Sequence, residues 1–462
     1  MPLEAHKCSV WYSWDMRVTP YGAAQTVTGS CHLLEEGEYK LLLDCGAYQG
    51  AEDDRNAEPF GFEPGAIDAV VISHAHNDHI GRLPLLLRRG YRGRVYLSEP
   101  TAKFLPVILE DSLRLMREEL ERLERKGKPT PPVLWDEQDL SELYRRLEPV
   151  PLYQDLAFGP LTVRLRGAGH LPGSAFIDVR AQGKHFIFSG DLGHRRKEVL
   201  PDPDYPTAAD LVLCEGTYGD RPHRPFADTI REFSEILNTH LGQGGKVFIP
   251  SFALERTQEV LFYLRELESQ KAIPSVPVYV DSPMAEQISE IYPGVKSYFS
   301  TEVQALFNQG LDPFRPGQYS HTRSVEDSKA LNRLNGPLII IAGSGMLSGG
   351  RILHHLALGL PGAQNAVVIT GYQPRGGLGQ LLIEGAESLR IFGETVPVRA
   401  KTYTLGGFSG HAGQDELLDW LGGERRIALV HGEPDKLQIL QQELSKRGQT
   451  AWLAEWGKAI EV

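Results

Sequence analysis

The 462-residue chain has few cysteines, no long hydrophobic run and no excess of basic residues. Only 4 residues are cysteine and none forms a CxxC pair, so we expect neither a disulfide framework nor a cysteine-rich zinc finger. No apolar run approaches the roughly 18 residues that span a bilayer, which argues against a membrane protein. The N-terminus also lacks the basic and hydrophobic regions of a secretion signal, so we expect a cytoplasmic protein.

The charge balance is acidic, with 48 basic and 60 acidic residues and a net charge of -12. This balance argues against a protein that coats nucleic acid by bulk electrostatics, although it leaves room for a locally basic groove. Hydrophobic residues at 41% and charged residues at 23% are typical of a globular protein. The length corresponds to roughly two or three domains of ordinary size.

Several short apolar segments end in polar residues that are capable of chemistry. They are KLLLDCG with Asp44, AVVISHAHNDH with His74, HFIFSGD with Asp191, LVLCEGTYGD with Glu215 and IALVHGE with His431. Short runs rich in Val, Ile, Leu and Phe predict buried strands, and functional groups of layered α/β proteins gather where such strands end. We therefore expect these residues to meet at one edge of the fold.

The stretch 244–372 alternates between strand-like and helix-like segments, for example KVFIPSF, then ALERTQEVLFYLRELES, then VPVYVDSP. This alternation predicts a parallel sheet covered by helices. The flanking regions have more closely spaced strands and glycine-rich loops. We therefore expect one domain inserted within another, with a charged surface helix at 109–128 outside the insert.

His74, His76, Asp78 and His79 place four potential metal ligands within six residues, directly after an apolar strand. In an extended segment residues i and i+2 point the same way, so His74 and His76 can converge on one cation while Asp78 and His79 face a second. Nitrogen and oxygen ligands without thiolates suit Zn²⁺ in a hydrolytic site, with Mn²⁺ or Fe²⁺ as alternatives. A surface turn rich in histidine is the non-functional alternative.

His170 in GAGHLPGS, Asp191 in FSGDLG and His431 in LVHGE are further candidate ligands. Each follows an apolar strand or lies in a glycine turn, where backbone can approach a site closely. This position distinguishes the three from the other histidines of the chain, which we interpret as packing or surface residues.

The motifs, in their order, resemble those of the metallo-β-lactamase superfamily, and specifically its β-CASP branch of nucleic-acid-processing nucleases. Asp44, SHAHNDH, His170 and Asp191 are similar to its first four motifs, and Glu215, His411 and His431 to the β-CASP motifs A, B and C. The strings IPSFALERTQE, VDSPMA, AGSGMLSGGR and GYQPRGGLG also match. The resemblance is to bacterial and archaeal relatives of the endonuclease subunit of the cleavage and polyadenylation machinery, without the KH domains of the archaeal members.

The resemblance implies an α/β fold in which a metallo-β-lactamase αββα four-layer sandwich carries an inserted β-CASP α/β domain, a parallel sheet flanked by helices. We place the first part of the metallo-β-lactamase domain at 1–207, the insert at 208–395 and the C-terminal part at 396–462.

The resemblance also implies two metal ions, expected to be Zn²⁺, bridged by Asp191 and a water. The first is held by His74, His76 and His170 and the second by Asp78, His79 and His431. Two adjacent cations lower the pKa of a bridging water towards about 7 and neutralise charge on an attacked phosphate. Asp78 is expected to orient the hydroxide.

Three further residues have implied supporting roles. Asp44 fits a position behind the ligands, where it fixes them by hydrogen bonds. His411 is the candidate general acid for the departing ribose oxygen, with Glu215 raising its pKa. An ordinary surface carboxylate is the alternative for Glu215.

Glycine-rich segments at 343–350 and 371–379 can present backbone N–H groups to phosphates. We expect Ser344 and Gly345 to contact substrate phosphate in this way, with Arg256, Arg351 and Arg375 as further contacts.

RNA is the expected substrate, because a histidine at motif C accompanies RNA processing in the family. Single-stranded RNA would enter between the two domains and be cut within the strand to leave a 3′-hydroxyl and a 5′-phosphate. Two alternatives are a superfamily hydrolase of small esters, thioesters or phosphodiesters, and a catalytically inactive RNA-binding scaffold. The insert argues against the first and the complete ligand set against the second. The sequence leaves the oligomeric state open, a homodimer included.

Overall fold

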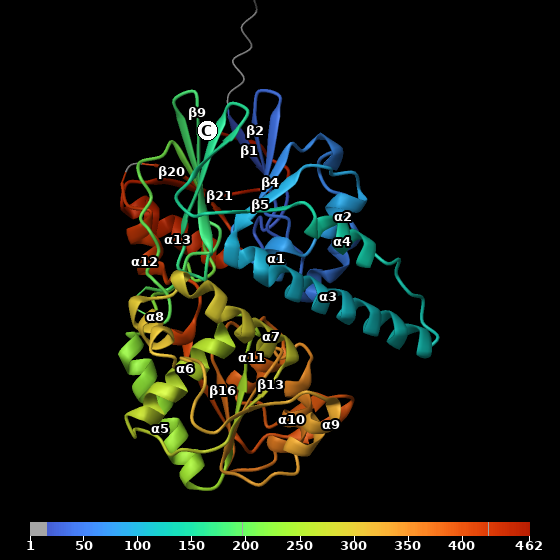
Figure 1. Cartoon of the computed structure of the whole chain (residues 1–462), viewed down its shortest axis with the longest axis vertical. Coiled ribbons are helices and arrows are strands. Elements are labelled where there is room, and N and C mark those ends of the chain that lie inside the picture. The colour runs from blue at the N-terminus through green and yellow to red at the C-terminus, as the bar shows by residue number, and fades with distance from the viewer. Residues whose placement is uncertain (1–15, 196, 424) are drawn as a thin grey trace, which may run out of the picture.

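The computed structural model describes residues 16–195, 197–423 and 425–462. The chain forms one part built on two sheets and a second part, the insert, built on a third sheet (Figure 1). Cys8 and the region inspected for a secretion signal lie outside the described residues. The other cysteines, Cys31, Cys45 and Cys214, are buried and free, as expected for a chain without a disulfide framework. None of the described helices has both the length and the apolar character needed to cross a membrane.

The first sheet has seven strands in the order β22-β1-β2-β3-β4-β5-β6. They are β1 (Arg17–Pro20), β2 (His32–Glu36), β3 (Tyr39–Leu43), β4 (Ala69–Val71), β5 (Arg94–Ser98), β6 (Leu147–Val150) and β22 (Ile460–Glu461). The strands from β22 to β3 pair antiparallel, and those from β3 to β6 pair parallel.

The second sheet also has seven strands, in the order β21-β20-β11-β10-β9-β8-β7. They are β7 (Asp155–Phe158), β8 (Leu161–Gly167), β9 (Ala175–Ala181), β10 (Lys184–Phe188), β11 (Leu211–Glu215), β20 (Arg426–Val430) and β21 (Thr450–Leu453). Its antiparallel half runs from β7 to β10, and β10, β11, β20 and β21 are parallel.

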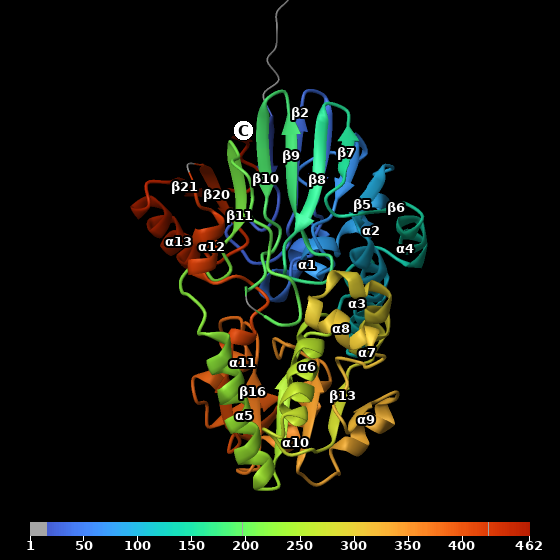
Figure 2. The same cartoon turned by 60° about the vertical axis from the view of Figure 1, so that its left-hand side comes forward.

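The two sheets pack face to face, and helices cover their outer faces (Figures 1 and 2). The helices on the first sheet are α1 (Asn77–Ile80), α2 (Leu83–Arg88), α3 (Glu99–Arg125) and α4 (Glu137–Tyr144), and those on the second are α12 (Gln414–Trp420) and α13 (Pro434–Lys446). Leu213 of β11 packs with Leu41 and Leu43 of the first sheet, whereas Val212 packs with Leu437 of α13. Successive residues of a strand face opposite sides, so both faces of β11 are buried. This is the predicted αββα order.

The insert contains a six-stranded parallel sheet in the order β14-β13-β15-β12-β16-β19. Its strands are β12 (Lys246–Pro250), β13 (Val278–Asp281), β14 (Tyr319–His321), β15 (Leu338–Ala342), β16 (Ala366–Ile369) and β19 (Lys401–Thr404), with a hairpin of β17 (Ser388–Ile391) and β18 (Glu394–Pro397). Its helices are α5 (Phe226–Gly242), α6 (Arg256–Ser269), α7 (Pro283–Ile291), α8 (Thr301–Asn308), α9 (Val325–Leu331), α10 (Arg351–Gly359) and α11 (Leu378–Ile383). The predicted alternation of strand and helix is confirmed.

Short 3₁₀ helices complete the secondary structure: η1 (Gly50–Ala57), η2 (Pro64–Ala66), η3 (Tyr292–Tyr298) and η4 (Gly406–Phe408).

The strand partners place the domain limits differently from the predicted segments 1–207, 208–395 and 396–462. β11 follows residue 207, yet it pairs with β10 and β20 of the second sheet. β19 follows residue 395, yet it pairs with β16 of the insert. A sequence pattern marks a strand but not the sheet that it joins. We propose that the insert begins after β11 and ends after β19.

Helix α3 connects the two parts of the molecule. It begins at Glu99, ten residues before the predicted start, because Ser98 caps it by accepting a hydrogen bond from the Thr101 N–H. Its first half reaches the insert, where Phe104 packs against Tyr292 with ring centroids 5.8 Å apart. Its second half projects away from the body (Figure 1).

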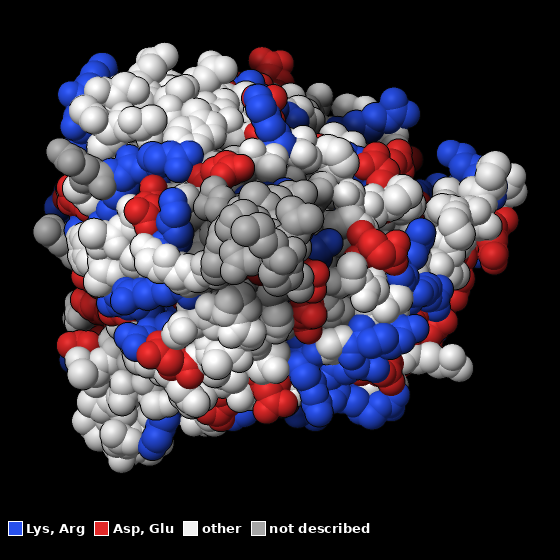
Figure 3. Space-filling view, turned by 90° about the horizontal axis from the view of Figure 1, so that it is seen from above, with Lys and Arg blue, Asp and Glu red and all other residues white. Residues whose placement is uncertain are grey.

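Acidic and basic side chains are interspersed over the described part of the face farthest from the insert (Figure 3). This mixture agrees with the acidic overall charge and with the expectation that bulk attraction does not hold a polyanion.

Asp281 fixes the strand ends of the insert from the carboxyl end of β13. Its buried carboxylate accepts hydrogen bonds from Thr322 Oγ1 at 2.5 Å and from Ser328 Oγ, Arg351 Nη1 and His355 Nε2 at 2.6 Å each. These partners come from separate segments around α9 and α10, so one side chain joins several loops of the insert.

We predict that Asp281→Ala lowers the free energy of unfolding by about 3–5 kcal/mol, because Arg351 and His355 lose the buried carboxylate that compensates them. Guanidinium unfolding followed by circular dichroism measures the change. Asp155→Ala is the control, since Asp155 pairs with Arg164 on the surface and its loss is expected to leave the midpoint unchanged. Equal midpoints for both variants would show that the Asp281 cluster does not stabilise the insert.

Candidate functional site

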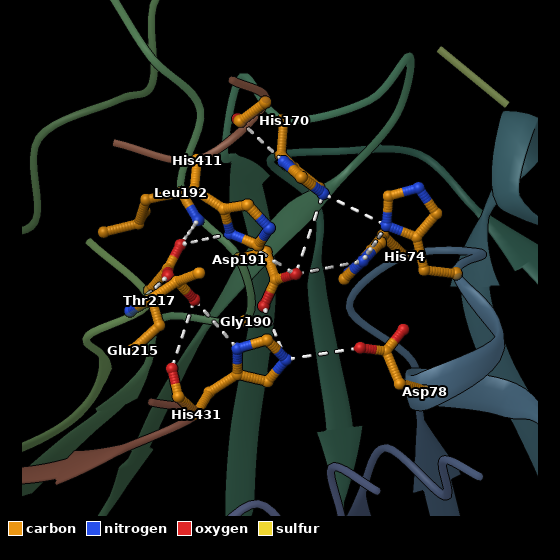
Figure 4. Close-up of polar contacts among 12 residues, drawn as sticks. His74, Asp78, His170, Gly190, Asp191, Leu192, Glu215, Thr217, His411 and His431 are labelled. Atoms are coloured by element: carbon orange, nitrogen blue, oxygen red, sulfur yellow. Dashed lines mark hydrogen bonds and ion pairs between the residues drawn. The ribbon is translucent and has the colours of Figure 1, made fainter. Parts of the chain in front are cut away.

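The polar strand-end residues meet at the edge of the sandwich that faces the insert. Asp44 follows β3, the segment from His74 to His79 follows β4, Glu215 is the last residue of β11, and Asp191 and His431 follow β10 and β20. The side chains point towards one another (Figure 4). The seven predicted ligands and the pair His411 and Glu215 all fall within three groups of close polar atoms, of which the first and third share Asp191.

The first group consists of His74, His76, His170 and Asp191. His76 Nδ1 lies 3.2 Å from His74 Nε2 and 3.1 Å from His170 Nε2. Asp191 Oδ2 lies 3.5 Å from His74 Nε2 and 3.6 Å from His170 Nε2. Four ligands at about 2.1 Å from a tetrahedral ion stand about 3.4 Å apart, so these separations fit one shared cation.

The second group consists of Asp78, His79 and His431. His79 Nε2 and His431 Nε2 face each other at 3.3 Å, and Asp78 Oδ2 lies 3.5 Å from His431 Nε2. The separations are again those of atoms that can share one ion.

Asp191 stands between the two groups. While its Oδ2 faces the first group, its Oδ1 lies 3.3 Å from His79 Nε2 and 3.6 Å from His431 Nε2 in the second. Oδ1 is buried and accepts no hydrogen bond from the part of the chain that the structure describes. A buried carboxylate oxygen in this state is costly unless a cation compensates it, so the residues present fit a pair of bound metal ions.

Protonation in the first group favours metal binding. Burial, with the charge of neighbouring imidazoles, lowers the pKa of His76 and of His170 to about 3 and that of His74 well below its usual value. Burial opposes ionisation of Asp191, but the nearby histidines hold its pKa well below the usual range. The group therefore presents neutral nitrogens and an ionised carboxylate, which are the forms that bind cations.

Asp44 fixes the ligand segment from behind. Its buried carboxylate accepts hydrogen bonds from the Ser73 N–H at 2.7 Å, from Ser73 Oγ at 2.8 Å and from Ser30 Oγ at 3.2 Å. His79 Nδ1 donates to it over 2.7 Å, which leaves the Nε2 lone pair directed at the second group. The supporting role of Asp44 behind the ligands stays a prediction.

Two other imidazoles are held in the same way. His170 Nδ1 donates to the Gly410 carbonyl oxygen over 2.8 Å, and His431 Nδ1 lies 3.1 Å from Thr217 Oγ1. Sequence reasoning missed Ser73, Thr217 and Gly410, because small residues beside a motif carry no signal that reveals their partner.

His411 and Glu215 form a pair beside the first group. His411 Nδ1 lies 3.3 Å from Glu215 Oε1 and 3.8 Å from Asp191 Oδ2. Glu215 is fully buried and is fixed by the Leu192 N–H, which donates to Oε1 over 2.7 Å. Burial lowers the pKa of His411, but the carboxylates of Glu215, Asp191 and Asp78, with Glu215 contributing most, together raise it to about 9. The surface alternative for Glu215 is wrong, and His411 carries a proton at neutral pH.

The site is open on one side. Most of the side chains in the three groups are buried, but the Asp78 and His411 side chains are 18% and 20% exposed. Asp78, His411 and the partly exposed His76 are the members of the three groups that solvent reaches.

The predicted phosphate contacts have different surroundings. Arg256 is buried and pairs with Glu259 at 2.5 Å and Glu255 at 3.1 Å. Arg351 donates to Asp281. Both guanidinium groups compensate buried carboxylates of the insert, a role that the sequence did not predict, and their contacts with phosphate stay predictions. A spacing pattern reveals a cation but not the acid that folding places beside it.

The other predicted phosphate contacts stay predictions. Arg375 is 75% exposed and pairs with Asp435 of α13 at 2.5 Å, so it joins the insert to the sandwich. Ser344 Oγ lies 3.2 Å from Ser348 Oγ, and the carbonyl oxygen of buried Gly345 accepts from Gln373 Nε2 at 2.8 Å.

Sequence profiles of three known domains match this chain. The metallo-beta-lactamase superfamily matches residues 25–236, the Beta-Casp domain matches 257–382, and a Zn-dependent metallo-hydrolase RNA specificity domain matches 395–454. The matches follow one another along the chain and include every proposed ligand.

Characterised proteins are similar over nearly the whole chain. Ribonuclease TTHA0252 of Thermus thermophilus is 52% identical over 97% of this chain and 100% of its own length. Transcription termination factor FttA of Lokiarchaeum sp. is 30% identical over 96% of this chain and 70% of its own length. Integrator complex subunit 11 of Danio rerio is 27% identical over 94% of this chain and 71% of its own length.

A solved structure supports the fold. The crystal structure of a protein of unknown function from Enterococcus faecalis V583 matches with a TM-score of 0.55 and 14% identity, over 97% of this chain and 100% of that one. Taken with the profile matches and the relatives, the arrangement of sandwich, insert and strand-end ligands shows that the chain belongs to the metallo-β-lactamase superfamily and, within it, to the β-CASP family.

Proposed function

We propose that this protein is a metal-dependent ribonuclease that hydrolyses phosphodiester bonds within RNA strands. The observation that carries the proposal is the carboxylate of Asp191, which stands between two groups of ligands with the protonated His411 beside it. The relative from Thermus thermophilus is named a ribonuclease, and the segment similar to an RNA specificity domain includes His411 and His431.

The donor set fits two divalent cations, and we propose Zn²⁺ because nitrogen ligands predominate. His74, His76 and His170 would hold one and Asp78, His79 and His431 the other, with Asp191 shared. When bound, such a pair acidifies water and neutralises the charge that develops on an attacked phosphate.

The protein's own residues supply the proton transfers. Asp78 lies at the open edge, where its carboxylate can orient the attacking water. His411, which is protonated at neutral pH, can donate to the departing ribose oxygen, a poor leaving group that needs a proton. Glu215 is the carboxylate that keeps His411 charged until then.

Bound metal ions would also make the first group more attractive to RNA. Asp191 is ionised and His74, His76 and His170 are neutral, so the first group by itself carries negative charge, although the pKa values of the nearby His79, His431 and His411 are raised. Two dications reverse the sign at this position. Single-stranded RNA can then lie along the exposed edge between the sandwich and the insert.

We predict that Asp191→Ala reduces bound metal from two ions per chain to fewer than one, because both groups lose a ligand. Loss of a residue that only supports a metal ligand already lowers metal affinity or activity about 10- to 100-fold. Loss of a ligand shared by both ions should therefore lower RNA cleavage at least about 100-fold. Metal analysis by mass spectrometry and denaturing gels of labelled single-stranded RNA measure the two effects. Asp202→Ala, a carboxylate outside the three ligand groups, is the control.

The proposal would be contradicted if the wild-type protein held two ions and cleaved a thioester but left RNA intact. The protein would then be a small-molecule hydrolase. If the protein binds RNA while holding less than one metal ion per chain, the proposal is also contradicted, and the protein would be an RNA-binding scaffold.

His411→Ala is expected to lower RNA cleavage by about 10²- to 10⁴-fold, the usual contribution of a general acid, with metal content unchanged. Hydrolysis of bis(p-nitrophenyl) phosphate should be retained, because p-nitrophenolate leaves without a proton. Parallel rate measurements on both substrates test this, and equal losses on the two would contradict the role of His411.

The Glu215–His411 pair makes a pH prediction. A general acid must be protonated, so RNA cleavage should fall as pH rises through the pKa of His411, which the Glu215 carboxylate raises. Glu215→Gln removes that carboxylate, and the descending limb of the pH profile should therefore move to lower pH. An unmoved or upward-shifted limb would show that Glu215 does not set the protonation of His411.

A further inference from the structure

The loop that carries His411, residues 408–411, is held through its backbone carbonyl groups. Lys197 Nζ donates to the carbonyl oxygens of Phe408 at 3.4 Å and Ser409 at 3.0 Å. The Gly410 carbonyl accepts from His170, and that of His411 accepts from His223 Nε2 at 2.9 Å. Each of the four consecutive carbonyls is thus bound by a side chain from outside the loop.

Lys197 also contacts the insert. Its ammonium group forms an ion pair with Glu259 of α6 and lies 3.7 Å from Glu255, which precedes α6. The side chain is only 7% exposed. A buried ammonium group is costly unless it is paired, and here two carboxylates and two carbonyl oxygens compensate it.

The segment around Lys197 is fastened to the insert by its backbone. The Glu198 N–H donates to Tyr263 Oη over 3.1 Å, and the Ser300 N–H donates to the Val199 carbonyl oxygen over 3.1 Å. Tyr263 lies in α6 and Ser300 caps α8. The position of the insert therefore fixes the position of the Lys197 ammonium.

The backbone and the packing at this junction leave little room for adjustment. Glu255 has a φ of 73°, a left-handed conformation that a non-glycine residue adopts at an energetic cost. A Cβ on Gly410 would lie 3.1 Å from the His170 ring and 3.2 Å from Arg256 Nη2, so the loop passes between a proposed metal ligand and the Arg256 guanidinium group. A small shift of α6 must move the loop.

We propose that Lys197 is a positioning residue that transmits the seating of the insert to His411. Its ammonium group holds the 408–411 loop against α6, so that the imidazole of His411 keeps its place beside the ligand groups. The polar contacts of Lys197 are with the Phe408 and Ser409 carbonyl oxygens and with Glu255 and Glu259, and it acts through the loop. This inference rests on the proposed ribonuclease function and on His411 as its general acid.

The test compares two substrates with different leaving groups in the Lys197→Met variant. This substitution keeps a side chain of similar length and removes its charge. We expect kcat for RNA cleavage to fall about 10- to 100-fold, the range seen for residues that orient a functional group, with KM and metal content unchanged. Hydrolysis of bis(p-nitrophenyl) phosphate should change by less than about threefold, because this leaving group needs no proton. Lys197→Arg should recover most of the RNA activity.

Two further variants separate positioning from stability. Lys446→Met makes the same substitution at an exposed lysine of α13 and should leave both activities unchanged. Lys197→Met in a His411→Ala background should cause no additional loss, since the residue acts through His411.

Equal losses on both substrates, or unchanged RNA cleavage, would overturn the inference. If Lys197→Met does not fold, Glu259→Gln removes the partner of the ammonium group and must show the same selective loss. A wild-type protein that cleaves no RNA contradicts the proposed function itself, whereas an active wild type with an equally active Lys197→Met contradicts only the role of Lys197.

Discussion

The whole site depends on one buried carboxylate. Asp191 presents one oxygen to His74 and His170 and the other to His79 and His431, and the oxygen on the second side has no hydrogen bond from the described residues. Such a group is stable only beside positive charge, so the protein's fold creates a demand for cations at this point. The imidazoles around it, together with Asp78, supply the remaining ligands.

The fold meets this demand by bringing strand ends together. Parallel strands of both sheets end at the same edge, which places side chains from segments far apart in sequence within hydrogen-bond distance of one another (Figure 4). The insert lies against that edge and contributes Glu255, Arg256 and Glu259 to a buried charged cluster behind the loop of His411. Ligand geometry therefore comes from the sandwich, and the position of the proposed acid depends on both parts of the molecule.

The sequence pattern was sufficient to identify the candidate ligands, because they stand after apolar strands or in glycine turns, and the resemblance to the β-CASP family implied their division between two ions. It was also sufficient for the parallel sheet of the insert, whose strands and helices alternate regularly. It could not predict the partners of buried charges. Arg256 and Arg351 were expected at phosphate, but folding places Glu259 and Asp281 beside them. It likewise could not assign β11 and β19 to their sheets, and it gave no sign of Lys197, which acts through backbone carbonyl groups of a distant loop.

The central claim is that Asp191 is shared by two adjacent cations. Anomalous scattering from crystals of the protein purified with its metal, collected on both sides of the zinc absorption edge, tests it most directly. The account predicts two peaks about 3.5 to 4 Å apart, one on each side of the Asp191 carboxylate. A single peak, or peaks away from Asp191, would contradict it.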